Sequence, residues 1–343
     1  SGKWAMPFPR VRKRPAPRGK IRWPAGISQF PPAAENSIVR FSDRAHLLSE
    51  WLCFGINGLE NNMSAQKVER IAAFSEAGSG GNPAGVLIAD SLPPAEEMQR
   101  IAAEVGFSET AFAAPEGESW RVRYFAPESE VPFCGHATIA LGAALARRHG
   151  DGVFKLSLNE AEITVEGGQR DGTLTAALQS PPTRSGKASP DLESGVMDLF
   201  GYTVEDLHAD IPPALIHGGA DHFVLALNSR QALADMNYDL EAGRELMNRH
   251  GLVTVLLVYP EGPQLFHTRN PFASGGVYED PATGAATAAF AGYLRDIGWP
   301  HAGRIDIVQG EDMGMLSRLH AEFSSEPGSS IRVSGQARVM TAE

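Results

Sequence analysis

An internal repeat limits the folds open to this chain more than any other sequence feature. Residues 130–145 read EVPFCGHATIALGAAL, and residues 279–294 read EDPATGAATAAFAGYL. The two segments align without a gap at an offset of 149 residues, and seven of their sixteen positions are identical. Both carry the frame Glu-x-Pro-x-x-Gly-x-Ala-Thr, which alanine richness alone does not produce. The repeat indicates a duplicated unit, and therefore two halves of similar architecture.

Each copy of the repeat predicts a turn that leads into a buried helix. Pro and Gly set the turn, and the helices are expected to begin near Gly135 and Gly284. Small and apolar residues then cover nearly every face, which is typical of a helix surrounded by protein. Small side chains at the start leave backbone N–H groups exposed, and such a helix N-terminus attracts a carboxylate or phosphate. Two purely structural helices would give the same repeat.

The chain after residue 68 alternates between short strands and turns. Helices are expected over residues 94–106 and 239–251, where apolar residues recur at helical spacing. The Ser-, Pro- and Gly-rich segment 180–195 predicts a boundary between an N-terminal domain, residues 63–185, and a C-terminal domain, residues 186–343. Many short strands and few helices predict an α+β fold with mostly antiparallel, curled sheets rather than a parallel nucleotide-binding sheet.

The charge is distributed unevenly along the chain. Residues 1–62 hold ten Lys or Arg and four acidic residues, a net of +6, whereas the remainder carries −17. The overall charge of −11 argues against nucleic acid as the main partner. The basic, Pro-rich segment 1–62 predicts a poorly structured extension ahead of Met63, with a short helix only at residues 45–55. A nucleic-acid arm and an organelle transit peptide are the alternatives.

Motifs for cofactors, metals and membranes are absent from the sequence. Two cysteines, Cys53 and Cys134, are too few for a disulfide framework, and no apolar run approaches the ~20 residues that span a bilayer. We expect a soluble, cytoplasmic protein without a membrane partner. Dinucleotide, P-loop, H-E-x-x-H and G-x-S-x-G motifs are all missing. The sequence therefore predicts neither a metal nor an organic cofactor.

Five segments of the chain resemble the successive signature blocks of the phenazine-biosynthesis PhzF-like isomerases. They are AFSEAGSGGNPAGVLI (73–88), GFSETAF (106–112), VPFCGHAT (131–138), EDPATG (279–284) and VQGEDMG (308–314). The resemblance runs in order from about residue 68 to the C-terminus. It implies the diaminopimelate-epimerase-like fold, in which two domains each wrap a curled sheet around a central helix and the active site lies between them. It also implies that the last strand returns to the N-terminal domain, and that the protein is a homodimer.

The resemblance assigns roles to individual residues. Glu109 corresponds to the family's acid/base, His136 to its active-site histidine, and Asp280 to an acidic residue that faces the cleft and contacts the substrate. Taken alone, Glu109 is also typical of a solvated turn, His136 of a structural hydrogen-bonding group, and Asp280 of a helix-start charge. The predicted substrate-binding positions lie around the two helix starts: Gly135, Ala137, Thr283, Gly284 and Ala285.

Several positions depart from the patterns of the family and its relatives. The epimerase cousins use one thiol from each half, but Cys134 aligns with Thr283, which cannot supply a thiolate. Two-thiol racemisation is therefore excluded as the expected mechanism. Ala285 stands where the family often has Ser, and Met315 and Leu316 stand where it often has Arg-Pro. These changes weaken the transfer of the family's best-known substrate, a dihydro-hydroxyanthranilate.

Together these observations predict a cofactor-independent isomerase for a small carboxylated metabolite. Glu109 would remove a proton from an acidic C–H of a conjugated or amino-acid-like substrate and return it at another carbon. An epimerase or racemase that pairs Glu109 with a second acid is one alternative. A non-catalytic metabolite-binding protein on the same scaffold is the other.

Overall fold

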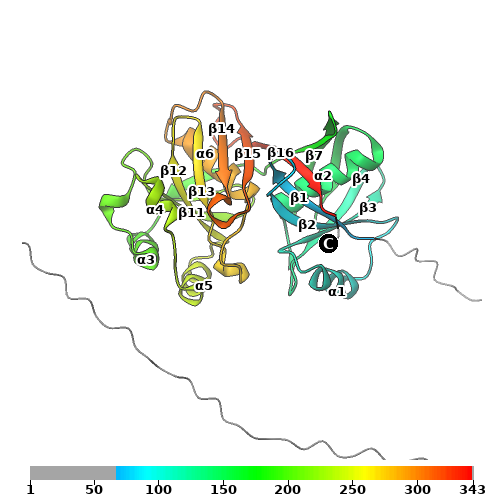
Figure 1. Ribbon diagram of the computed structural model, residues 1–343, viewed down its shortest axis with the longest axis horizontal. Helices are drawn as coiled ribbons and strands as arrows, with labels where there is room; N and C mark the ends of the chain where they lie inside the picture. The colour runs from blue at the N-terminus through cyan, green and yellow to red at the C-terminus, as the bar shows by residue number, and fades with distance from the viewer. Residues whose placement is uncertain (1–66, 342–343) are drawn as a thin grey trace, which may run out of the picture. The chain divides into compact units, whose positions relative to one another are not determined.

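The computed structural model describes residues 67–341, which fall within one compact unit that spans Asn62–Glu343. The extension expected at residues 1–62, with its short helix, lies outside the described residues. In the part that is described, every strand joins one mixed sheet of 16 strands, and two helices lie inside its curled halves (Figure 1).

The first half is a closed ring of strands around α2. Its elements are β1 (Glu69–Ser75), β2 (Asn82–Ile88), α1 (Ala95–Val105), β3 (Thr110–Glu116), β4 (Ser119–Phe125), β5 (Glu130–Val131), α2 (Gly135–His149), β6 (Gly152–Ser157), β7 (Glu162–Arg170) and β8 (Thr173–Gln179). The ring runs β1-β2-β3-β4-β6-β7-β8 and is closed by β16 (Arg332–Val339), which pairs with both β8 and β1. The last strand of the chain thus completes the sheet of the first half.

The second half wraps an open, curled sheet around α6. Its elements are β9 (Arg184–Lys187), α3 (Pro190–Phe200), η1 (Val204–Asp206), β10 (Ala214–His217), β11 (Asp221–Ala226), α4 (Arg230–Ala234), α5 (Leu240–Arg249), β12 (Thr254–Pro260), β13 (Leu265–Arg269), η2 (Ala273–Gly275), α6 (Gly284–Asp296), β14 (Arg304–Gln309), η3 (Glu311–Met313) and β15 (Ser317–Glu322). Its strands follow the order β16-β15-β14-β13-β12-β11-β10-β9.

Pairing in both halves is mostly antiparallel. The exceptions are β2–β3, β4–β6, β11–β12 and β13–β14, which are parallel. The predicted α+β class, with a curled and mostly antiparallel sheet around a central helix in each half, is confirmed. No helix within residues 67–341 is long and apolar enough to cross a membrane.

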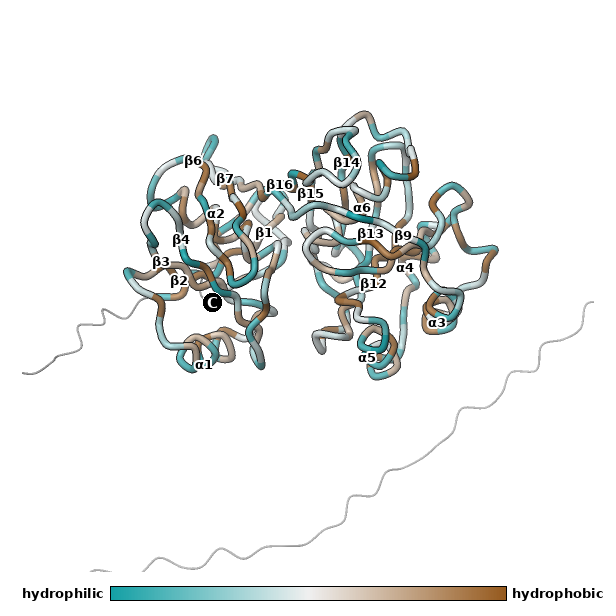
Figure 2. Tube along the Cα trace, turned by 180° about the vertical axis from the view of Figure 1, so that it is seen from behind, coloured by the Kyte–Doolittle hydropathy of each residue, from teal (hydrophilic) through white to brown (hydrophobic). Residues whose placement is uncertain are grey.

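The central helices are buried because their sequences carry small or apolar residues on all faces. Residues 135–146 of α2 and 284–295 of α6 are buried without interruption. Both helices begin at the predicted glycines, Gly135 and Gly284. Brown, hydrophobic stretches of the chain lie along the strands packed on these helices (Figure 2). Burial of this apolar surface is the main stabilising contribution that an interior helix can make.

The segment expected to be a domain boundary, residues 180–195, contains regular structure. The strand β9 pairs with β10 of the second half. The helix α3 begins at Pro190, and Leu192 N donates a hydrogen bond to Ser189 Oγ at 3.2 Å. A Ser cap followed by Pro in the first turn is a helix-start signal, which the Ser-, Pro- and Gly-rich composition concealed. The chain therefore crosses between the halves over residues 180–183.

The contact between α2 and β7 gives a test of this packing. A Cβ atom at Gly167 of β7 would lie 2.1 Å from the Gly142 carbonyl oxygen of α2, whereas one at the adjacent Gly168 would lie 3.5 Å from its nearest neighbour. Overpacking typically costs about 1–3 kcal/mol. We expect Gly167→Ala to lower the free energy of unfolding in urea by that amount relative to Gly168→Ala. Equal stability of the two variants would contradict the close approach of helix and strand.

Candidate active site

The N-terminal ends of the two central helices, α2 and α6, lie close together. A Cβ atom at Gly135 would lie 3.1 Å from Ala285 N and 3.3 Å from Gly284 Cα. A larger residue at Gly135 would therefore press on the backbone of the other half. No side chain caps the start of either helix. The first-turn N–H groups and the positive ends of two helix dipoles thus meet in one place, which favours an anion there.

Glu109 and His136 lie together beside these helix starts. Glu109 is positioned between the end of α1 and the start of β3, and its side chain is buried, as is that of His136 in the first turn of α2. Glu109 Oε2 lies 3.4 Å from His136 Nε2 and accepts no hydrogen bond from any residue that the structure describes. Ser108 Oγ lies 3.3 Å from the same ring nitrogen.

Asp280 reaches the same region from the second half, and a residue of the first half holds it. Asn82 Nδ2 of β2 donates to Asp280 Oδ1 at 2.7 Å and to Ala282 O at 3.0 Å. Thr283 Oγ1 donates to Asp280 Oδ2 at 2.5 Å. These bonds fix the carboxyl group directly before α6 and tie the two halves together.

Burial makes Asp280 a group that exchanges its proton near neutrality. Loss of hydration raises its pKa to about 6, and the negative charge of Glu109 adds to this increase. Attraction to His136 and the hydrogen bonds from Thr283 and Asn82 act in the opposite direction. Burial dominates because desolvation penalises the charged form of a carboxyl group.

The predicted substrate-binding positions all lie at the joined helix starts, and all but Thr283 are buried. Thr283 has little capacity left for a ligand. Its hydroxyl accepts hydrogen bonds from Asn270 Nδ2 and from Gln309 Nε2, and its backbone N–H donates to Gln309 Oε1 at 3.1 Å. Thr283 therefore positions Asp280.

The sequence interpretation missed the groups that hold the acidic residues in place. Asn82 and Gln309 lie within the quoted blocks GSGGNPAG and VQGEDMG, and Ser108 lies within GFSETAF. The sequence signal that could have indicated Asn82 and Gln309 was an amide side chain next to a turn that contains Gly or Pro. The nearby Gly-rich turn also contacts the C-terminal loop, because Gly81 N donates to Leu316 O at 3.0 Å.

A residue set of metal-ligand type also exists here, although no metal was predicted. Glu109, Cys134 and His136 each offer one ligand atom, and these atoms lie within 4.8 Å of one another. All three side chains are buried. Linear spacing could not reveal this set, because Glu109 precedes Cys134 by 25 residues and joins it only through the fold.

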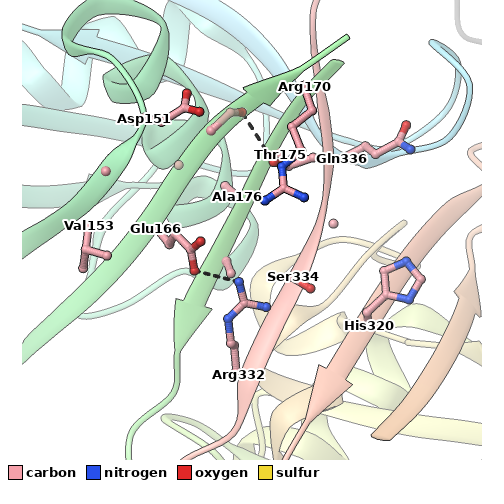
Figure 3. A pocket seen from close by; sticks show the side chains of 15 residues that line it. Asp151, Val153, Glu166, Arg170, Thr175, Ala176, His320, Arg332, Ser334 and Gln336 are labelled. Atoms are coloured by element: carbon pink, nitrogen blue, oxygen red, sulfur yellow. Dashed lines mark hydrogen bonds and ion pairs between the residues drawn. The ribbon is translucent and has the colours of Figure 1, made fainter. Parts of the chain in front are cut away.

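A hollow with a volume of about 630 Å³ lies elsewhere, over β7, β8, β16 and their neighbours (Figure 3). Arg332 forms ion pairs there with Glu166 at 2.7 Å and Glu322 at 2.9 Å. None of the predicted site residues lines it. It also lacks the buried acids and the helix starts, which meet at the junction of α2 and α6.

Comparisons with known proteins agree with this architecture. The family model of the phenazine biosynthesis-like protein matches residues 71–343. An uncharacterized isomerase of Bacillus subtilis is 27% identical over 282 residues, 79% of this chain and 94% of that protein. The trans-2,3-dihydro-3-hydroxyanthranilate isomerase of Pseudomonas fluorescens is 30% identical over 271 residues, 77% of this chain and 94% of that protein.

A comparison with a solved structure supports the same fold. The crystal structure of a PhzF-family phenazine biosynthesis protein of Bacillus anthracis superposes with a TM-score of 0.70 at 23% identity, and the match covers 80% of this chain and 96% of that one. Fold and relatives together define an isomerase built from two halves. The chain belongs to the phenazine biosynthesis-like protein family.

The raised pKa of Asp280 predicts a pH dependence of stability. Between about pH 4 and 6 the folded chain keeps a proton on Asp280 that the unfolded chain has lost, since an unfolded Asp has a pKa near 3.9. Stability therefore falls as the pH rises through this window, by roughly 3 kcal/mol in total. We expect the free energy of unfolding of Asp280→Asn, measured in urea, to rise relative to that of the wild type between pH 4 and pH 7. The exposed Asp198→Asn is the matched control, and parallel curves for all three proteins would contradict the assignment.

Proposed function

We propose that the protein shifts a proton within a small carboxylated metabolite, with Glu109 as the carrier. The observation that carries the proposal is the carboxylate oxygen Oε2 of Glu109. It is buried, lies 3.4 Å from His136 Nε2, and accepts no hydrogen bond from the residues described by the structure. A positioned carboxyl group of this kind can take a proton from one carbon and return it to another. General acid/base catalysis needs such a group within reach of the substrate proton.

The substrate carboxylate would lie at the joined starts of α2 and α6. Two uncapped helix N-termini supply free N–H donors and a positive field at one point. His136 and Asp280 would orient the substrate, because both side chains are buried beside Glu109 and both come from or precede a central helix. Exclusion of water from this buried place strengthens each of these interactions.

The substrate class we propose is a conjugated or amino-acid-like carboxylate. The relative from Pseudomonas fluorescens is named for trans-2,3-dihydro-3-hydroxyanthranilate, which is such a compound. Ala285 replaces the Ser that the family often carries, so this chain offers no hydroxyl at that point of the α6 start. A substrate that needs a hydrogen bond there would bind less well than one with an apolar group.

An epimerase that uses two acids is the second candidate. The pKa of Asp280, raised to about 6 by burial, gives a second carboxyl group that can exchange a proton near neutral pH. In an epimerase, deuterium from solvent would enter at the stereocentre with inversion. In the proposed isomerase, it would enter at a new carbon together with movement of a double bond.

Replacement of Glu109 tests the proton carrier. Glu109→Gln keeps the shape of the side chain but cannot accept the proton, and acid/base contributions are typically ~10²–10⁴-fold in rate. We expect turnover of trans-2,3-dihydro-3-hydroxyanthranilate, and deuterium incorporation from D₂O followed by mass spectrometry, to fall by that factor while affinity changes little.

Glu116→Gln is the matched control, because Glu116 lies at the exposed end of the same strand, β3. It should leave rate and exchange unchanged. Near-normal exchange in Glu109→Gln would overturn the assignment of Glu109. A wild-type protein that binds the compound without any exchange would instead favour the non-catalytic metabolite-binding alternative.

A further inference from the structure

Three buried side chains that the fold brings together have the chemistry of a metal site. Cys134 Sγ lies 3.3 Å from His136 Nδ1 and 3.9 Å from His136 Nε2, and His136 Nε2 lies 3.4 Å from Glu109 Oε2. A tetrahedral Zn²⁺ with bonds of about 2.0–2.3 Å to S, N and O ligands separates those atoms by about 3.3–3.6 Å. The separation between Glu109 Oε2 and His136 Nε2 falls in this range, and all three ligand atoms lie within 4.8 Å of one another. The thiol, which contacts Nδ1, would have to move toward Nε2 to share the ion.

A second observation points to a ligand between these atoms. Glu109 is only 6% exposed, yet its Oε2 accepts no hydrogen bond within the described part of the chain, residues 67–341. A buried polar atom without a partner is costly, and a bound cation would supply the missing interaction.

We propose that Glu109, Cys134 and His136 form a Zn²⁺ site with three protein ligands and one open position. Cys, His and Glu are all ligands that zinc prefers, and three of them with a free fourth position form an exchangeable rather than a structural site. Two of the three ligands come from the start of α2 and one from the start of β3. The site therefore exists only in the folded first half.

Metal binding would displace a proton from the thiol. Burial, and next the charge of Glu109, raise the pKa of Cys134 well above its usual value, so the free side chain is a thiol. Zn²⁺ forms a bond to sulfur as the S–H bond breaks and the proton passes to solvent. Binding should therefore release about one proton per ion.

Occupation of this site would also block catalysis, a consequence that rests on the proposed function. The ion would hold the oxygen of Glu109 that takes the substrate proton and the ring of His136 that orients the substrate. Bound Zn²⁺ would then prevent turnover, and the metal would act as an inhibitor. The binding test below does not depend on any activity, so the two proposals can fail separately.

Co²⁺ titration of the full chain tests the site directly, because a cobalt–thiolate bond absorbs in the near ultraviolet. We expect the band in the wild type and in Cys53→Ser, and its loss in Cys134→Ser. Cys53 is the other cysteine of the chain and lies outside the described residues. A band that persists in Cys134→Ser, or no band in the wild type at stoichiometric Co²⁺, would overturn the proposal.

Competition with a chromophoric chelator then measures Zn²⁺ affinity. Glu109→Gln and His136→Asn should each weaken binding at least about 10-fold. His267→Asn is the matched control, since His267 contacts Glu261 at 2.6 Å and Glu311 at 3.1 Å on the surface. Circular dichroism verifies that each variant is folded. A further test leaves the site unchanged: in Cys53→Ser, bound Zn²⁺ should protect Cys134 from an alkylating reagent. Unchanged affinity in the ligand variants, or alkylation unaffected by Zn²⁺, would contradict the site.

Discussion

The contact between the first residues of α2 and α6 is the constraint on which the rest of the structure depends. Gly135 lies so close to Gly284 and Ala285 that a Cβ atom would meet the opposite backbone at 3.1 Å. Within residues 67–341, no side chain caps the start of either helix. The free N–H groups of two helices are thereby directed to one place, and an anionic ligand is the natural partner for them.

The acidic residues depend on the same junction. Asn82 of the first half donates to Asp280 of the second, and β16 at the end of the chain pairs with β1 and β8 of the first half. Each half therefore contributes to holding the other's functional groups. Burial of Glu109, His136 and Asp280 in this junction removes them from water, so that their charges interact more strongly than at the surface.

Much of this arrangement could be predicted from the sequence, because the repeat and the signature blocks lie at the helix starts. Gly135 and Gly284 begin their helices as predicted, and the curled sheets of both halves are confirmed. Proximity across the fold could not be predicted. The hydrogen bond from Asn82 to Asp280 spans 198 residues of sequence, and no local pattern reports such a pairing. The helix α3 could not be predicted from composition either. A Ser cap followed by Pro is as typical of a loop as of a helix start, unless the apolar face of the helix is known to be buried.

The most direct measurement of a shared anion site is the response of the two helix starts to one ligand. In protein labelled with ¹⁵N-glycine, the amide signals of Gly135 and Gly284 should shift together on titration with 2-aminobenzoate and yield the same dissociation constant. The uncharged 2-aminobenzamide should shift neither signal, because it lacks the carboxylate that the helix dipoles attract. Binding of 2-aminobenzoate that leaves both signals unmoved, or that moves only one of them, would contradict a site formed jointly by the two halves.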